Sequence, residues 1–158
     1  MEPVVLNEEL TLNLPEGFRI LSEEERKVMP STDEPPAWCA RDDQRHLVIV
    51  AYWKKIGGLS AMLINEKDVI RHVEQTVSKP MAQYGYHLEN WESILIGDRK
   101  AQGICYSYQA EGIGMMADSF VVKSRRTLYY FHAYSRSVLH EENRILLSDL
   151  FLRAVWND

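Results

Sequence analysis

Two segments of the 158-residue sequence are apolar at consecutive positions, and they constrain the fold more than any other feature. Leu47–Trp53 reads Leu-Val-Ile-Val-Ala-Tyr-Trp, and residues 128–131 read Leu-Tyr-Tyr-Phe. Successive side chains of a strand point to opposite faces of the sheet. A strand whose odd-numbered and even-numbered residues are both apolar is therefore covered on both faces. The two segments therefore predict central strands of one sheet with helices on both of its faces.

The other strand and turn patterns predict that this sheet is mainly antiparallel. Tight-turn signals such as Gly97-Asp98-Arg99-Lys100 separate the later apolar segments. The predicted strands are residues 10–14, 38–41, 47–53, 86–96, 101–110, 115–123 and 127–134. We expect these seven segments to join one sheet, in which the last four form a meander.

Helix signals are weaker in the first third of the chain. Ser22 followed by Glu23-Glu24-Glu25 is typical of an N-cap with acidic side chains in the first turn. This helix is expected to be short, because a proline-rich surface loop over residues 30–36 follows it. Residues 57–64 are expected to form a loop that is flexible at its glycines and apolar at its end, Leu59–Ile64.

Two longer helices follow. Asn65 is a suitable N-cap for an amphipathic helix over residues 65–84, whose last turn Pro80 is expected to kink. A second helix is predicted over residues 138–155, and its apolar side chains cannot all face one sheet. Two alternatives are open for this helix: burial under the N-terminal segment of the same chain, or contact with a partner or a second copy.

Composition limits the fold class and the location of the protein. Hydrophobic residues make up 46% and charged residues 26%, as in ordinary globular domains. We predict a single α+β domain over residues 1–158, a mainly antiparallel twisted sheet with helices on both faces. Its longest apolar run, Leu47–Trp53, is too short for a membrane span. The start lacks the basic and apolar regions of a secretory signal, which favours a cytoplasmic location provided that no leader was removed.

Charge argues against nucleic acid as the partner. The formal net charge is −5 and the isoelectric point is about 5.6. Nucleic-acid-binding domains usually have a basic isoelectric point and a concentrated basic surface. We therefore expect no nucleic-acid partner.

The order of the predicted elements resembles the fold of the photosystem protein PsbP and the Ran-binding Mog-type proteins. The opening Leu12–Phe18, the helix end Tyr84-Gly85 and the turn Gly97–Ala101 carry the resemblance. It continues in the closing strand with Tyr129, Phe131 and Ser135. The resemblance implies the fold of a small bacterial member of this superfamily, and it favours binding over catalysis. No residue here matches a metal site or the Ran-binding surface.

Residues with catalytic or metal-binding chemistry are scattered along the sequence. Two cysteines, Cys39 and Cys105, are too few for a disulfide framework or a thiolate zinc site, and we interpret both as small buried hydrophobes. His72 lacks a second histidine at zinc spacing, and His132 is expected to be a core histidine. His140 precedes two acids that suit a helix N-terminus. The sequence therefore predicts no catalytic residue, no metal and no cofactor.

Two features indicate a binding surface. Tyrosine and tryptophan suit surfaces that are half apolar and half wet. The basic residues Lys123, Arg125, Arg126 and Arg136, near the ends of the last two predicted strands, suit an anionic ligand or acidic partner. Leucine and phenylalanine of the C-terminal helix are candidate partner contacts. The candidate site residues are Trp53, Trp91, Tyr106, Tyr108, Lys123, Arg125, Arg126, Leu147 and Phe151.

We expect a non-enzymatic binding or adaptor module whose partner is another protein or a second copy in a homodimer. The alternative is a small hydrolase or ligand-processing enzyme with a cleft between sheet and helix. A deep pocket that holds polar groups with perturbed pKa values favours the enzyme. A pocket lined mainly by aromatic side chains favours binding.

Overall fold

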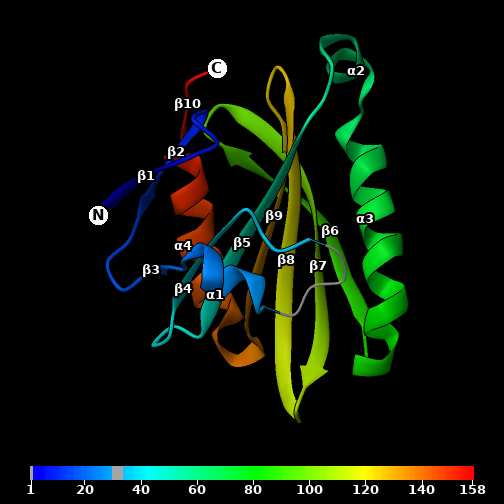
Figure 1. Ribbon diagram of the computed structural model, residues 1–158. Helices are drawn as coiled ribbons and strands as arrows, with labels where there is room; N and C mark the ends of the chain where they lie inside the picture. The colour runs from blue at the N-terminus through cyan, green and yellow to red at the C-terminus, as the bar shows by residue number, and fades with distance from the viewer. Residues whose placement is uncertain (1, 30–33) are drawn as a thin grey trace.

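The computed structural model describes residues 2–29 and 34–158, and Figure 1 shows the arrangement of their elements. The strands are β1 (Glu2–Leu6), β2 (Leu10–Leu14), β3 (Arg19–Ile20), β4 (Trp38–Asp42), β5 (Leu47–Lys55), β6 (His87–Ile96), β7 (Arg99–Ala110), β8 (Ile113–Lys123), β9 (Thr127–Arg136) and β10 (Val155–Trp156). The helices are α1 (Glu23–Lys27), α2 (Gly58–Leu63), α3 (Glu66–Met81) and α4 (His140–Leu152), with short 3₁₀ turns at 82–84 and 137–139.

Within the described residues, seven strands form one antiparallel sheet in the order β3-β4-β5-β9-β8-β7-β6. The two doubly apolar segments lie in β5 and β9, which are neighbours in the middle of the sheet. They pair along their length from Leu47 opposite Ser135 to Lys55 opposite Thr127. The predicted antiparallel sheet, its central strands and its closing meander are confirmed.

The strand at residues 10–14 corrects one part of the prediction, because it does not belong to this sheet. It is β2, and it pairs with β1 and with β10 in a separate three-stranded sheet. Leu10, Leu12 and Leu14 are buried on one face, and the polar residues between them are only partly covered. One apolar face is all that a strand needs to pack as a second layer over the main sheet.

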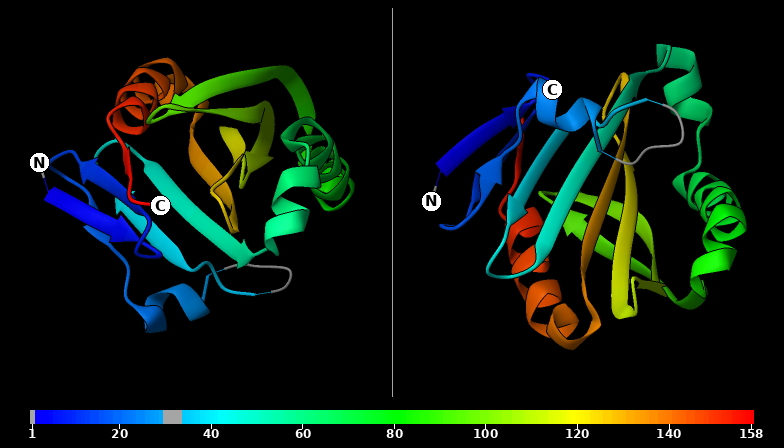
Figure 2. Two further views of the ribbon diagram at one scale, coloured as in Figure 1. Left: turned by 90° about the horizontal axis from the view of Figure 1, so that it is seen from above. Right: turned by 60° about the horizontal axis from the view of Figure 1, so that its bottom comes forward.

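Two layers cover the two faces of the main sheet (Figure 2). On one face, Ile70 and Val73 of α3 pack against Ile104, Tyr106 and neighbouring side chains of β7 and β8. On the other face, α4 and the small sheet form the main core with the inward side chains of β5, β8 and β9. We call these the α3 face and the α4 face.

The predicted helix signals are largely confirmed. Ser22 and Glu25 form a capping box at α1, in which each side chain bonds the other residue's backbone N–H. Asn65 caps α3, Pro80 lies in its last turn, and the helix passes into the 3₁₀ turn before Gly85. Part of the predicted proline-rich loop, residues 30–33, lies outside the described residues.

Within the segment 57–64, residues Gly58–Leu63 form the helix α2, which corrects the prediction of a loop. Backbone bonds from Ala61 to Gly57 and from Ile64 to Ser60 close its turns. Lys123 donates to the carbonyl oxygens of Ala61 and Ile64 at 2.6 and 2.7 Å, and so satisfies the helix end. No helix in the described part of the chain has both the length and the apolar character to cross a membrane.

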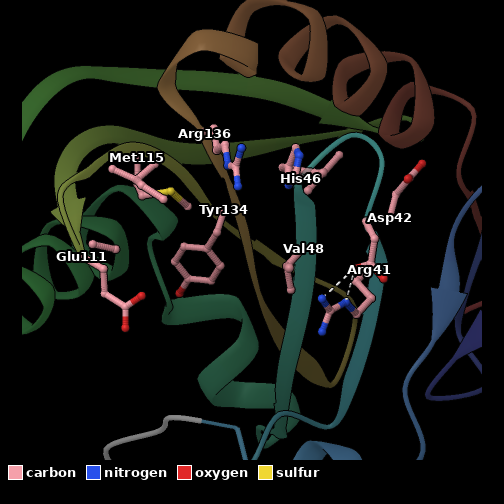
Figure 3. Close-up of a pocket in the computed structure, with 12 residues that line it drawn as sticks. Arg41, Asp42, His46, Val48, Glu111, Met115, Tyr134 and Arg136 are labelled. Carbon is pink, nitrogen blue, oxygen red and sulfur yellow. Dashed lines mark hydrogen bonds and ion pairs between the residues drawn. The ribbon is translucent and has the colours of Figure 1, made fainter.

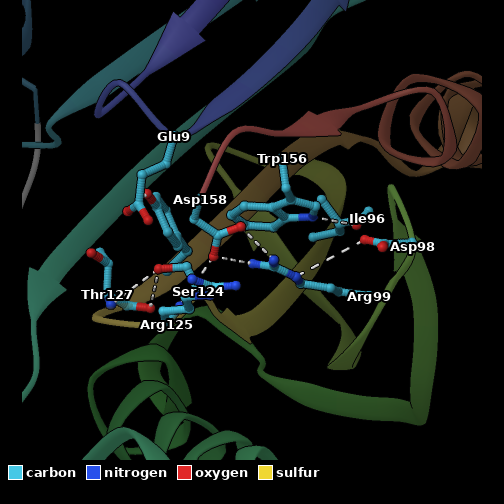
Figure 4. A network of polar contacts seen from close by, with 10 residues as sticks. Glu9, Ile96, Asp98, Arg99, Ser124, Arg125, Thr127, Trp156 and Asp158 are labelled. Carbon is cyan, nitrogen blue, oxygen red and sulfur yellow. Dashed lines mark hydrogen bonds and ion pairs between the residues drawn. The ribbon is translucent and has the colours of Figure 1, made fainter. Parts of the chain in front are cut away.

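The C-terminal helix ends earlier than predicted, at Leu152, because the following residues join the small sheet (Figure 4). The Trp156 indole donates to the carbonyl of Ile96 at 2.7 Å. The Asp158 carboxylate accepts from Arg99 at 2.8 Å and from the backbone N–H of Arg125 at 3.1 Å. These contacts fasten the end of the chain to the β6–β7 and β8–β9 turns.

Asp158→Asn tests this attachment. The Arg99 guanidinium lowers the pKa of the Asp158 carboxyl, so its stabilisation is present above the ordinary value of 3.8 and is lost as pH falls below it. We expect the substitution to lower the free energy of unfolding by about 1–2 kcal/mol at pH 7, and by less at pH 3. Urea unfolding at both pH values measures this difference. Asp98→Asn, which changes an exposed carboxylate 4.0 Å from the same arginine, is the matched control. Equal effects of the two variants would contradict the attachment.

Candidate functional site

A cavity of about 290 Å³ opens at one end of the main sheet, between the β4–β5 and β7–β8 turns (Figure 3). The end of β9 lies between these turns and supplies the rest of the lining. The lining residues are Arg41, Asp42, Asp43, His46, Leu47, Val48, Ala110, Glu111, Ile113, Met115, Tyr134 and Arg136. We call this cavity the Arg136 pocket.

Strand register brings these residues together from distant parts of the chain. Leu47 pairs with Ser135, so the next residues outward, His46 and Arg136, are adjacent at the end of the sheet. Met115 pairs with Arg136 from the other side. Figure 3 shows Arg136 and His46 at one side of the pocket and the Glu111 carboxylate at the other.

Most charges at the pocket already have partners. Arg41 donates to Asp43 at 2.7 Å, and Asp42 accepts from Arg45. Among the described residues, the Arg136 guanidinium and the Glu111 carboxylate have no hydrogen bond and no ion pair. The pocket therefore presents one unpaired cation and one unpaired anion, separated by the apolar side chains of its floor.

A row of aromatic side chains leads away from the pocket along the α3 face. Tyr134 stacks on His132 with ring centres 6.3 Å apart, and His132 contacts Tyr52 at 5.9 Å. Further across the sheet, in β7, the ring centre of Tyr106 lies 5.9 Å from that of Tyr108. Burial raises the pKa of Tyr108 to about 12, so this surface carries neutral hydroxyl groups.

The four predicted aromatic residues occupy different places. Tyr108 is partly exposed on the α3 face, whereas Tyr106 is buried behind it and cannot contact a ligand, which corrects that prediction. Trp53 packs against Tyr129 on the α4 face. Trp91 is 51% exposed and lines a second cavity of about 280 Å³ beside Lys67, Ile70 and Arg71 of α3.

The predicted basic cluster is divided between two ends of the sheet. Lys123 is occupied in capping α2, and Arg125 and Arg126 lie in the β8–β9 turn. Arg136 is the last residue of β9, nine residues after the first residue Thr127, so it lies about 30 Å from that turn at the rise of a strand. The predicted strand over residues 127–134 already separates Arg126 from Arg136, so this division agrees with the sequence pattern.

The prediction that Leu147 and Phe151 contact a partner is corrected by their burial. Their side chains are 1% and 0% exposed in the core between α4 and the main sheet. The exposed apolar residues of α4 are instead Ile145 and Leu152, at 69% and 53%. Leu147 and Phe151 therefore follow the first alternative, burial within their own chain.

Two pairs of side chains resemble a nucleophile with its base, and in neither pair is the nucleophile activated. Ser119 Oγ lies 2.7 Å from His132 Nδ1, but Ser119 is fully buried, and burial lowers the pKa of His132 to about 4. Cys105 lies 3.8 Å from His140, but burial raises the pKa of its thiol, so the unreactive thiol predominates. An accessible nucleophile with a positioned base is needed for hydrolysis. Neither pair meets that requirement.

No family model and no curated protein matches the sequence. The solution structure of cyanobacterial PsbP (CyanoP) from Synechocystis sp. PCC 6803 is similar, with a TM-score of 0.64 at 14% identity over 93% of this chain and 86% of that one. LpqN, involved in cell envelope biogenesis of Mycobacterium tuberculosis, is similar with a TM-score of 0.59 at 15% identity over 94% and 83%. Identities this low establish the architecture alone. The chain has the PsbP-like α+β fold that its sequence resembles.

Proposed function

We propose that the chain is a non-catalytic binding module that takes an anionic group of a partner protein into the Arg136 pocket. One observation carries the proposal: an arginine without a partner faces a cavity whose floor is apolar and aromatic. Arginine is suited to bidentate recognition of carboxylates. Val48, Met115 and Tyr134 offer contact area for the rest of the ligand.

The charges of the pocket favour a ligand group with a single negative charge. Glu111 lies across the pocket from Arg136 and would repel a second negative charge. A volume near 290 Å³ is at the lower end of small-molecule sites, and it suits one or two side chains of a protein segment. An acidic side chain beside an apolar one therefore fits better than a nucleic acid or another polyanion.

Exposed apolar residues of α2 support a protein as the partner. Leu59, Met62 and Leu63 are 74%, 80% and 76% exposed, at the end of the sheet opposite the pocket (Figure 1). Solvent-exposed apolar clusters are characteristic of interaction surfaces. We propose that α2 adds to the contact with the partner or with a second copy of the chain. Two free cysteines, both buried, suit a cytoplasmic location, which we also propose.

A pair of capped dipeptides tests the pocket. Acetyl-Leu-Glu-amide should bind, whereas the neutral acetyl-Leu-Gln-amide should bind at least 10-fold more weakly, since a hydrogen bond to a charged group contributes about 1.5–3 kcal/mol. Arg136→Gln should remove this preference in calorimetric titrations. Arg126→Gln, which removes an equal charge from the other end of β9, should keep it. Equal affinity of wild type for the two peptides would refute the proposal.

A further inference from the structure

A second group of functional side chains lies on the α4 face, away from the Arg136 pocket. Cys105 of β7, Asp118 of β8 and His140 of α4 each offer one ligand atom, and these three atoms lie within 4.8 Å of one another. His140 Nε2 is 3.8 Å from Cys105 Sγ and 2.8 Å from Asp118 Oδ2. The three residues come from three different elements.

The fold fixes this arrangement through register and burial. Cys105 pairs directly with Asp118 across β7 and β8, so their side chains share one face of the sheet. The first residue of α4 is His140, which the 3₁₀ turn after β9 brings over that pair. Cys105 is 3% exposed and the Asp118 side chain is 2% exposed, so the ligand atoms are held by packed surroundings.

Two buried carboxylate oxygens beside this group have no hydrogen-bond partner, Oδ1 of Asp118 and Oε2 of Glu92. Arg144 holds the other oxygen of Glu92 at 3.0 Å, but it is 3.7 Å from Asp118 Oδ1, which is too long for a hydrogen bond. Buried acceptors are almost always satisfied. A proton shared by the two carboxyls is one way to satisfy them. Burial, followed by the neighbouring Asp118 carboxylate, raises the pKa of Glu92 to about 8 and so favours its protonated form. A bound cation is the other way.

We propose that Cys105, Asp118 and His140 bind a zinc ion, with the Glu92 carboxylate beside them as a neighbouring negative charge. Thiolate, imidazole and carboxylate are the ligands that zinc takes in proteins. Tetrahedral zinc with bonds of about 2.0–2.3 Å holds its ligand atoms roughly 3.3–3.6 Å apart. The distance from His140 Nε2 to Cys105 Sγ is slightly above this range and the distance to Asp118 Oδ2 is below it. Small side-chain movements therefore bring the three ligand atoms to the spacing that zinc requires.

Charge balance supports a divalent ion. The net charge is −2 when the Cys105 thiolate, the Asp118 and Glu92 carboxylates and the Arg144 guanidinium are counted and the His140 imidazole is neutral. One zinc ion neutralises this charge. Only His140 is appreciably exposed, at 20% of its side chain, so the site is nearly closed. Closed sites are structural, and this ion would fasten the start of α4 to the sheet. The proposal replaces the sequence-based expectation of no metal, which rested on ligand spacing along the chain.

Cobalt(II) titration of chelator-treated protein tests the site, because a thiolate ligand gives cobalt a strong near-ultraviolet charge-transfer band. The chain has only two cysteines, so Cys39→Ser is the matched control. We expect one equivalent of cobalt, displaced by zinc, in wild type and in Cys39→Ser. Cys105→Ser should lose the band and bind at least 100-fold more weakly, and His140→Gln should also bind more weakly.

Several outcomes would overturn the site. If the two carboxyls of Asp118 and Glu92 only share a proton and no metal binds, folded wild-type protein gives no thiolate-to-cobalt band at any cobalt concentration. Loss of the band in Cys39→Ser would place the metal elsewhere. Because retention of the band in Cys39→Ser already assigns the thiolate to Cys105, the test decides even if Cys105→Ser does not fold. The result is independent of the Arg136 pocket, which lies on the α3 side of the sheet end.

Discussion

Replacing Phe151 with alanine is expected to lower the free energy of unfolding by about 3–5 kcal/mol. Phe151 is fully buried, and its ring centre lies 5.1 Å from that of Phe131 and 6.3 Å from that of Phe120. The side chain fills the layer between α4 and the main sheet, and neighbours on both sides limit how far the cavity can collapse. Urea unfolding of the two proteins measures the loss.

Ile145→Ala on the same helix is the control, because that side chain is 69% exposed. We expect it to change the free energy of unfolding by less than about 0.5 kcal/mol. If Phe151→Ala instead stayed as stable as wild type and changed the mass of the protein in solution, α4 would be an interface. That result would restore the sequence-based prediction for Phe151 and contradict its place in the core.

Gly103→Ala is expected to have the next largest effect, a loss of about 3 kcal/mol from overpacking. Gly103 lies in β7 opposite Phe120 of β8. A Cβ atom at this position would lie 2.4 Å from the Phe120 ring and 2.7 Å from the backbone carbonyl of Ser119. Phe120 is 1% exposed, so its ring has no free space to move into.

Gly58→Ala is the matched control for this substitution. A Cβ atom there meets nothing within 4 Å, and alanine suits a helix better than glycine. Thermal unfolding should show a lower midpoint for Gly103→Ala and an equal or higher midpoint for Gly58→Ala. A neutral Gly103→Ala variant would mean that Phe120 does not occupy the space over β7.

Much of the fold was predictable because its signals are local. The doubly apolar segment Leu47–Trp53 is covered on both sides, as strand alternation requires. The capping box at Ser22 and the amphipathic pattern after Asn65 each fix a helix start within a few residues. These features need no knowledge of distant partners.

The parts that were missed depend on distant partners. Strand β2 lies outside the main sheet because it pairs with β1 on one side and, through Thr11 and Leu10, with Val155 and Trp156 far along the chain on the other. The segment Gly58–Leu63 became a helix whose end is satisfied by Lys123, about 60 residues away. Sequence patterns record neither pairing.

The sites were the least predictable features, for the same reason. Cys105, Asp118 and His140 lie far apart in sequence, and only the β7–β8 register and the turn after β9 bring them together. Arg136 was noted as basic, but its place in a pocket depends on the pairing of Leu47 with Ser135. Aromatic richness could not separate the partly exposed ring of Tyr108 on the α3 face from the buried ring of Tyr106.

The most direct test of the proposed function is to locate the bound peptide by NMR. Acetyl-Leu-Glu-amide added to isotope-labelled protein should shift the backbone amide signals of Val48, Met115, Tyr134 and Arg136, which line the pocket. The signals of Lys67 and Trp91 at the second cavity should stay unchanged. Shifts that gather at that second cavity, or no shifts at any peptide concentration, would contradict the assignment of the Arg136 pocket as the binding site.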